Sequence, residues 1–171
     1  MPESTRLADL LLPELEAELA KTRKVLERVP DGHNDFKSAE KSMPLSRLAG
    51  HTAEIAGFIA VILTTPSIDM GTPSDPRKIL RMETRDKLLA DYDELAARSL
   101  EALRTTTDAS FEETWTATRK GQTVFSGPRY KAYRNMTVNH MIHHRAQLGV
   151  CLRLLDVPVP PTFGPTADEA A

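Results

Sequence analysis

The chain has 171 residues, 40% of them hydrophobic and 27% charged, with a formal net charge of −2 and one cysteine, Cys151. This length suits a single domain, residues 1–171, with a sizeable core, and the charge offers no basic surface to nucleic acid or an anionic membrane. A lone cysteine excludes an internal disulfide, and the charged N-terminus does not resemble a signal peptide. The longest apolar run, residues 55–63, is about half of a membrane span. We therefore expect a cytoplasmic protein.

The first predicted helix runs from about Ser4 to Val29. Hydrophobic residues recur along it at steps of three and four, which is typical of an amphipathic helix. Pro13 lies inside this segment and should kink it or mark its true first turn. The sequence PDGHND ends the helix, and His33 in that turn should lie at the surface.

The second predicted helix begins near Ser42, a plausible N-cap, with Pro44 in its first turn, and continues to about Thr65. After His51 it is apolar on nearly all sides, which indicates a central, well-covered helix. His51 shares its core-facing side with a stripe of hydrophobic residues, Leu48, Ile55, Phe58 and Ile62. Residues 64–77 contain three prolines and a glycine and are predicted to be a loop.

The third predicted helix spans about Thr84 to Thr106. Residues 108–127 then break the helical period, and the loose alternation around Lys120-Gly121 is compatible with a short β-hairpin. Trp115 and Phe125 lie in this hairpin, where we expect them to pack rather than to cover a pocket.

The fourth predicted helix starts after Pro128 and runs to about Leu155. The tail, residues 156–171, has four prolines and is expected to lie extended along the domain. Four long helices in one small domain predict an all-α fold, a four-helix bundle, and the long loops between helices allow crossovers in it.

Three of the five histidines in the chain fall in the fourth helix. His140 and His144 are one turn apart on the core-facing stripe, whereas His143 is displaced by about 100° and should lie at the edge or outside. A pair spaced in this way can bind one divalent ion, although the spacing alone is a weak signal. His51 on the second helix supplies a third inward imidazole, and three histidines leave a metal position open for water or substrate.

Other interpretations of these residues remain open. The three histidines could instead hydrogen-bond to backbone carbonyls or to Glu54 with no metal present. Glu54 lies one turn after His51 and could orient its ring, or it could be a solvated or capping carboxylate. Arg145 and Gln147 are expected to point away from the face of His144, toward a helix–helix or dimer contact. Cys151 is about 10 Å along the helix from His144 and is expected to be a buried, inert thiol.

Two stretches carry a resemblance to a known family. LAGHTAE after KSMPLSRL, and NHMIHHRAQLGVCLRLLDVPVPPTFGPTADE downstream, resemble the DinB-like family of four-helix-bundle proteins over nearly the whole chain. The resemblance implies a homodimer and a metal, zinc or nickel, held by His51, His140 and His144. The family often has glycine where this chain has Ala146. Members with a known reaction include thiol S-transferases and related metal-dependent hydrolases.

The sequence thus predicts a metal-dependent enzyme acting on a small-molecule substrate. An ion on three neutral imidazoles would activate a low-molecular-weight thiol for transfer or a water for hydrolysis. No obvious general base beyond Glu54 and carboxylates near the loops is present, which favours thiol transfer slightly. The alternatives are a non-catalytic metal-binding or stress-responsive module, and a protein in which the histidines bind no metal.

Overall fold

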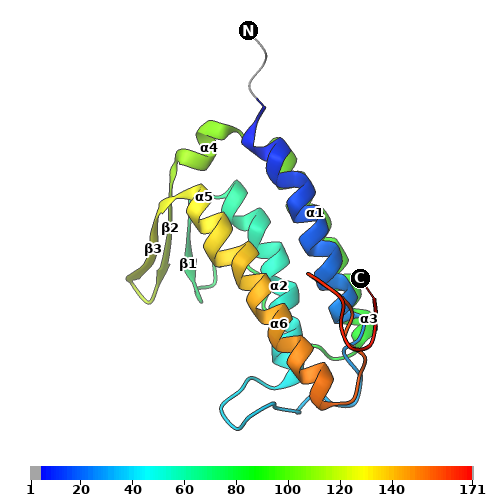
Figure 1. Ribbon diagram of the computed structural model, residues 1–171. Coiled ribbons are helices and arrows are strands. Elements are labelled where there is room, and N and C mark those ends of the chain that lie inside the picture. The colour runs from blue at the N-terminus through cyan, green and yellow to red at the C-terminus, as the bar shows by residue number, and fades with distance from the viewer. Residues whose placement is uncertain (1–4, 171) are drawn as a thin grey trace.

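The computed structural model describes residues 5–170, which are mostly helical (Figure 1). The expected mostly helical fold with a short hairpin is confirmed, but the hairpin belongs to a small three-stranded sheet, and the helices exceed the four that were predicted. The last long helical segment is continuous and contains a π-helical stretch, η1. The helices are α1 Leu7–Leu26, α2 Leu45–Thr64, α3 Arg85–Thr105, α4 Asp108–Glu112, α5 Arg129–Ala132, η1 Tyr133–Val138 and α6 Asn139–Leu154.

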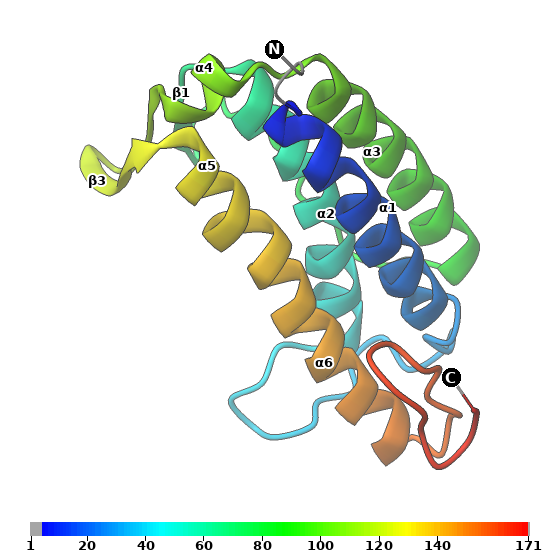
Figure 2. The same ribbon diagram turned by 45° about the horizontal axis from the view of Figure 1, so that its top comes forward.

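The long helices lie side by side, and α2 and α3 run in the same direction (Figures 1 and 2). Residues 71–84 return along α2 to make this crossover. The backbone N–H of Met82 donates to the carbonyl of Ser46 (2.9 Å), and that of Arg85 donates to Asp31 (2.7 Å). The crossover segment is therefore fixed against the N-terminal half of α2.

The helix ends follow the sequence with some differences. The predicted start at Ser4 lies outside the described residues, and Pro13 lies within α1. Helix α2 begins directly after Pro44, so the prediction that Ser42 caps it is wrong; the Ser42 hydroxyl accepts a hydrogen bond from Ser38 instead. Thr84 caps α3 by accepting from the N–H of Lys87, as Ser and Thr commonly do at this position.

Three strands form a sheet in the order β1-β2-β3: β1 Ser67–Met70, β2 Thr114–Arg119 and β3 Gln122–Pro128. Strands β2 and β3 are antiparallel, and Lys120 and Gly121 between them have φ of 51° and 75°, so the hairpin prediction is confirmed. Strand β1 is parallel to β2, so the prediction of a plain loop over residues 64–77 is wrong. Trp115 is fully buried against Phe58 and Phe125, in a packing role.

Helix α2 forms the centre of the fold. By length and composition alone this helix could cross a membrane. The expectation from its longest apolar run, which is about half of a membrane span, was that it could not. However, 67% of its most apolar window is buried inside the protein, as in the core helix of a globular fold. The side chains that bury it come from its neighbours α3 and α6.

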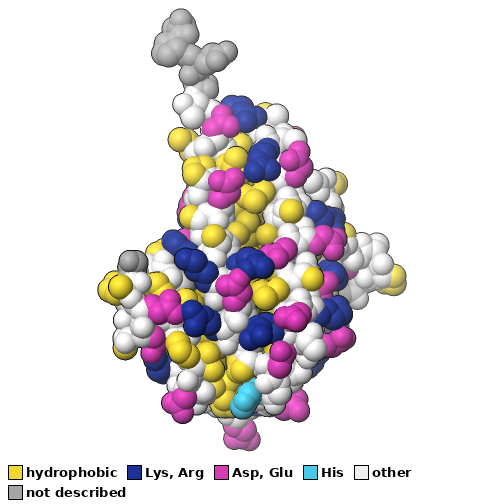
Figure 3. Space-filling view, turned by 90° about the vertical axis from the view of Figure 1, so that its right-hand side faces the viewer, with side chains coloured by type: hydrophobic (Ala, Val, Ile, Leu, Met, Phe, Trp, Pro, Cys, Tyr) yellow, Lys and Arg dark blue, Asp and Glu magenta, His cyan; other side chains and the backbone are white. Residues whose placement is uncertain are grey.

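The surface and the C-terminal tail complete the fold. On the face where α1 and α3 lie, basic and acidic side chains are interspersed (Figure 3).

The described part of the tail contains no helix or strand beyond Leu155. It closes into a loop rather than a fully extended run, because Thr166 Oγ1 donates to the carbonyl of Val159 and Asp168 accepts from the Val159 N–H.

Candidate metal centre

Three histidines from two helices converge in the core. His51 from α2 meets His140 and His144 from α6, and one ring nitrogen of each lies within 4.8 Å of the others. The ring centroids are 4.6–5.1 Å apart. His143 and His33 are exposed. The structure therefore brings together the three histidines that the sequence singled out and separates them from the other two.

The nearest polar partner of each Nδ1 in this triad is an oxygen that accepts a hydrogen bond, although Arg47 Nη2 also lies 3.3 Å from His51 Nδ1. His51 Nδ1 donates to Glu54 Oε1 (2.5 Å), and His144 Nδ1 donates to Gln147 Oε1 (2.8 Å). His140 Nδ1 donates to the carbonyl of Met136 (3.3 Å). Because the Nδ1 atoms carry the protons, the Nε2 atoms carry the lone pairs.

The Nε2 atoms of His140 and His144 are 2.8 Å apart. Two lone pairs at this distance repel unless a proton or a cation lies between them. The nitrogen ligands of a tetrahedral zinc ion are roughly 3.3 Å apart, from Zn–N bonds of about 2.0–2.1 Å. A shift of about half an ångström would therefore let both rings bind one ion, and the residues fit a divalent metal.

The surroundings keep two of these imidazoles neutral. Burial lowers the pKa of His144 to about 4, and the neighbouring His51 and His140 act in the same direction. Burial, followed by the proximity of His51, also lowers the pKa of His140. Neutral imidazole is the form that ligates a metal, so both rings are ready to bind at neutral pH.

Glu54 is held by more than its contact with His51. Its carboxylate accepts from both terminal nitrogens of Arg47 (2.8 and 3.1 Å) and from the backbone N–H of Leu80 (2.7 Å). Burial raises the pKa of Glu54, but the hydrogen bonds from His51 and Arg47 outweigh it and hold the pKa below its usual value. Glu54 is thus an anchored carboxylate that orients the His51 ring.

One expectation about α6 needs correction, and two are confirmed. Gln147, predicted to point away from the face of His144, accepts the hydrogen bond of that ring. Arg145 does serve a helix–helix contact: it is buried and pairs with Glu18 on α1 (2.6 Å). Cys151 is buried, as expected, and burial raises the pKa of its thiol.

The sequence reasoning therefore missed Gln147 and also Arg47. A usable signal was present, since Glu54 and Gln147 both stand three residues after the histidine that they orient. Residues at this spacing lie on the same face of a helix.

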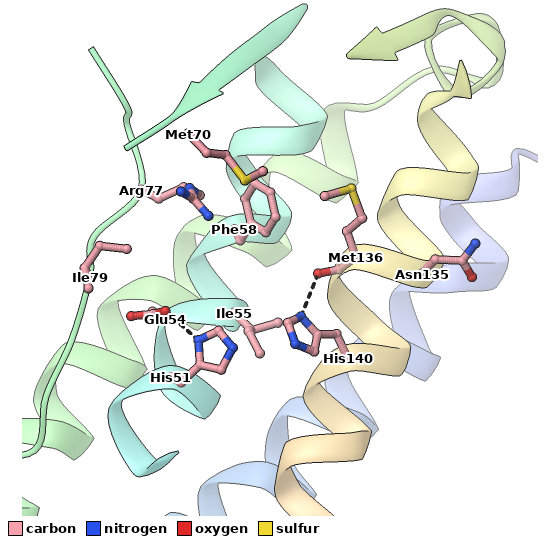
Figure 4. A pocket seen from close by; sticks show the side chains of 10 residues that line it. All are labelled: His51, Glu54, Ile55, Phe58, Met70, Arg77, Ile79, Asn135, Met136 and His140. Carbon is pink, nitrogen blue, oxygen red and sulfur yellow. Dashed lines mark hydrogen bonds and ion pairs between the residues drawn. The ribbon is translucent and has the colours of Figure 1, made fainter. Parts of the chain in front are cut away.

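A cavity of about 370 Å³ opens beside His51 and His140. Figure 4 shows it between α2, the η1–α6 segment and the crossover segment. Its walls are mostly apolar, and Arg77 and Asn135 add polar groups; the apolar residues are Ile55, Phe58, Met70, Ile79 and Met136. A small molecule in this cavity would lie directly against the histidine triad.

Comparison with known proteins adds a family and a fold. The model of the DinB family matches residues 1–171. A DinB-like protein from Bacillus cereus has a similar structure, with a TM-score of 0.68, 19% identity, and coverage of 92% of this chain and 98% of that one. A DinB-like protein from Bacillus subtilis gives a TM-score of 0.67 and 14% identity, covering 90% and 97%. These identities show a shared fold alone, and no curated protein matches the chain.

Proposed function

The chain belongs to the DinB family, and from this premise we propose that it is a metal-dependent enzyme whose ligands are His51, His140 and His144. The ion is zinc or nickel, and the substrate is a small molecule. The reaction is the transfer of a low-molecular-weight thiol to an electrophile, with hydrolysis as the other outcome of the same site.

One observation carries this proposal: each Nδ1 of the triad lies within hydrogen-bonding distance of an acceptor oxygen, which leaves Nε2 as the ligating atom, and one ring nitrogen of each histidine lies within 4.8 Å of the others. Metal-ligating histidines usually hold their second nitrogen in this way. When bound, a divalent ion on three neutral imidazoles would lower the pKa of a coordinating thiol or water.

The groups around the cavity support thiol transfer over hydrolysis. Hydrolysis is helped by a general base within reach of the attacking water. Among the residues that line the cavity, Glu54 supplies the carboxylate, and its oxygens are already engaged by His51, Arg47 and Leu80. Glu54 is therefore better suited to positioning His51 than to accepting a proton, whereas a thiol acidified at the site would release its proton to solvent before it attacks the electrophile.

Turnover tests the reaction class. Zinc- or nickel-loaded protein should catalyse the displacement of chloride from a chlorinated dinitrobenzene by cysteine or glutathione, and the catalysed rate should disappear in His140→Ala. Ester or amide hydrolysis without any thiol-dependent rate would identify a hydrolase instead. A metal that stabilises the protein while neither reaction proceeds would indicate a non-catalytic module.

Gln147 offers a second test through metal affinity. Gln147→Ala removes the acceptor of His144 Nδ1 and should weaken zinc binding by about 10- to 100-fold. Competition with a chromophoric chelator measures this change. Gln147→Glu keeps an acceptor oxygen and should stay within a few-fold of the unsubstituted protein. Equal affinity in Gln147→Ala would show that this hydrogen bond does not prepare the ligand.

The homodimer and the cytoplasmic location stay predictions. Val150 and Leu154 lie one turn apart on α6 with more than half of each side chain exposed, which provides apolar surface for a second copy.

A further inference from the structure

The molecule that occupies the cavity beside the histidine triad can be described further, on the premise of the proposed metal site. We infer that Arg77 binds a carboxylate of this molecule, and that an apolar spacer of roughly 8–10 Å joins the carboxylate to the end that meets the metal. Arg77 is thus a specificity-determining residue for an acidic, partly apolar small molecule.

The spacer length follows from the positions of residues on α2. His51, Glu54 and Phe58 lie on successive turns of one face, so His51 and Phe58 are about 10 Å apart along the axis. The guanidinium of Arg77 lies 5.3 Å from the centroid of the Phe58 ring. Figure 4 shows it reaching from the crossover segment toward this ring, at the end of the cavity away from the histidines.

The walls between these two ends are apolar, which sets the nature of the spacer. Phe58 and Ile55 line the α2 side, Met136 lines the η1 side, and Met70 lines the β1 side. Burying an alkyl or aryl spacer there is favourable because apolar surface leaves water.

Arg77 is held in place yet keeps one donor group. Its Nε and Nη2 bind Asp75 at 2.6–3.2 Å, and this contact with the guanidinium lowers the pKa of Asp75 to about 2. Within residues 5–170 no hydrogen bond involves its Nη1. A guanidinium fixed by one carboxylate loses little freedom on binding a second acceptor.

The charges near the cavity favour an anion. Arg77 with Asp75 and Arg47 with Glu54 form two ion pairs, each without net charge. A divalent ion on neutral imidazoles would then make the site positive overall. An acidic molecule would meet the ion at one end and the remaining donor of Arg77 at the other.

Matched thiols test the inference on cobalt-loaded protein. 6-Mercaptohexanoate should bind about tenfold more tightly than its uncharged analogue 6-mercaptohexanamide, as expected for one charge-assisted hydrogen bond. 3-Mercaptopropionate, which is too short to reach Arg77, should show no such gain over its own amide. Calorimetry gives the affinities, and thiolate-to-cobalt absorption reports sulfur at the metal.

Variants on the crossover segment assign the effect to Arg77. Arg77→Gln should bind the six-carbon acid and amide equally, Arg77→Lys should keep part of the preference, and the exposed control Arg81→Gln should keep all of it. If the unsubstituted protein binds the acid and the amide equally while the sulfur still binds cobalt, the role of Arg77 is overturned and the proposed function stays intact. No sulfur-to-cobalt absorption with any thiol would overturn both.

Discussion

Replacing Arg145 by leucine should lower the free energy of unfolding by about 3 kcal/mol, because it breaks a buried ion pair and leaves its partner in the core. Arg145 donates to the Glu18 carboxylate (2.6 Å), to the Glu18 carbonyl (3.0 Å) and to the Thr22 hydroxyl (3.2 Å). Glu18 is 4% exposed and, among residues 5–170, would keep only Lys21 (2.7 Å) as an ion-pair partner. Urea denaturation followed by circular dichroism measures the loss.

Two further variants test whether the unpaired Glu18 charge causes the loss of stability. Arg153→Leu removes the same charge from the same helix, but its side chain is 51% exposed, so its cost should be much smaller than that of Arg145→Leu. Glu18→Leu combined with Arg145→Leu should recover much of the loss, because no unpaired charge remains. A single Arg145→Leu change as mild as Arg153→Leu would contradict the role assigned to this pair.

The cost of Arg145→Leu should also depend on pH. Burial raises the pKa of Glu18, but the hydrogen bonds from Lys21 and Arg145 outweigh it and hold the pKa below its usual value. A lowered pKa contributes stability that is present above the unfolded-state pKa and disappears as the pH falls through the folded-state value. The difference in the free energy of unfolding between the unsubstituted protein and Arg145→Leu should therefore become smaller in acid.

Gly50→Ala should destabilise the protein by about 1–3 kcal/mol, although alanine favours helix. A Cβ at residue 50 would lie 2.4 Å from the carbonyl oxygen of Leu80 and 2.9 Å from the Cα of Arg81. Both are backbone atoms of the crossover segment, which would have to move. That movement would displace the Leu80 N–H from Glu54, so we also expect weaker zinc binding.

Gly149→Ala on α6 is the matched control and should act in the opposite direction. Its nearest neighbour would be Val159 Cγ1 at 3.7 Å, an ordinary contact, so the gain in helix propensity of up to about 1 kcal/mol should remain. Thermal unfolding of both variants with and without zinc checks the pair. If Gly50→Ala stabilised the protein, the backbone of the crossover segment would not be packed closely against residue 50 of α2.

Local patterns in the sequence predict much of this fold and of its candidate site. The stripes that place His51, His140 and His144 toward the core depend on helical period alone. The hairpin at Lys120-Gly121 depends on a short-range turn preference. These features are local, which explains why they can be recognised without the structure.

The features that the sequence did not reveal depend on contacts between distant segments. Strand β1 forms because Ser67 pairs with Thr116, far along the chain, and nothing in the local pattern of residues 64–77 indicates it. The parallel course of α2 and α3 depends on Met82 of the crossover segment bonding to Ser46 and on Arg85, at the start of α3, bonding to Asp31. The π-helical stretch at Tyr133–Val138 is of a rare type that is frequent at functional sites, and no local sequence pattern predicts it.

The metal content of the untagged protein tests the central claim most directly. Mass spectrometry after incubation with zinc or nickel should find about one equivalent in the unsubstituted protein and in His143→Ala, and almost none in His140→Ala. This result would establish that the inward-facing histidines, and not the exposed one beside them, hold the ion. No metal in the unsubstituted protein, or equal metal in His140→Ala, would contradict the account and leave the triad as packing in the core.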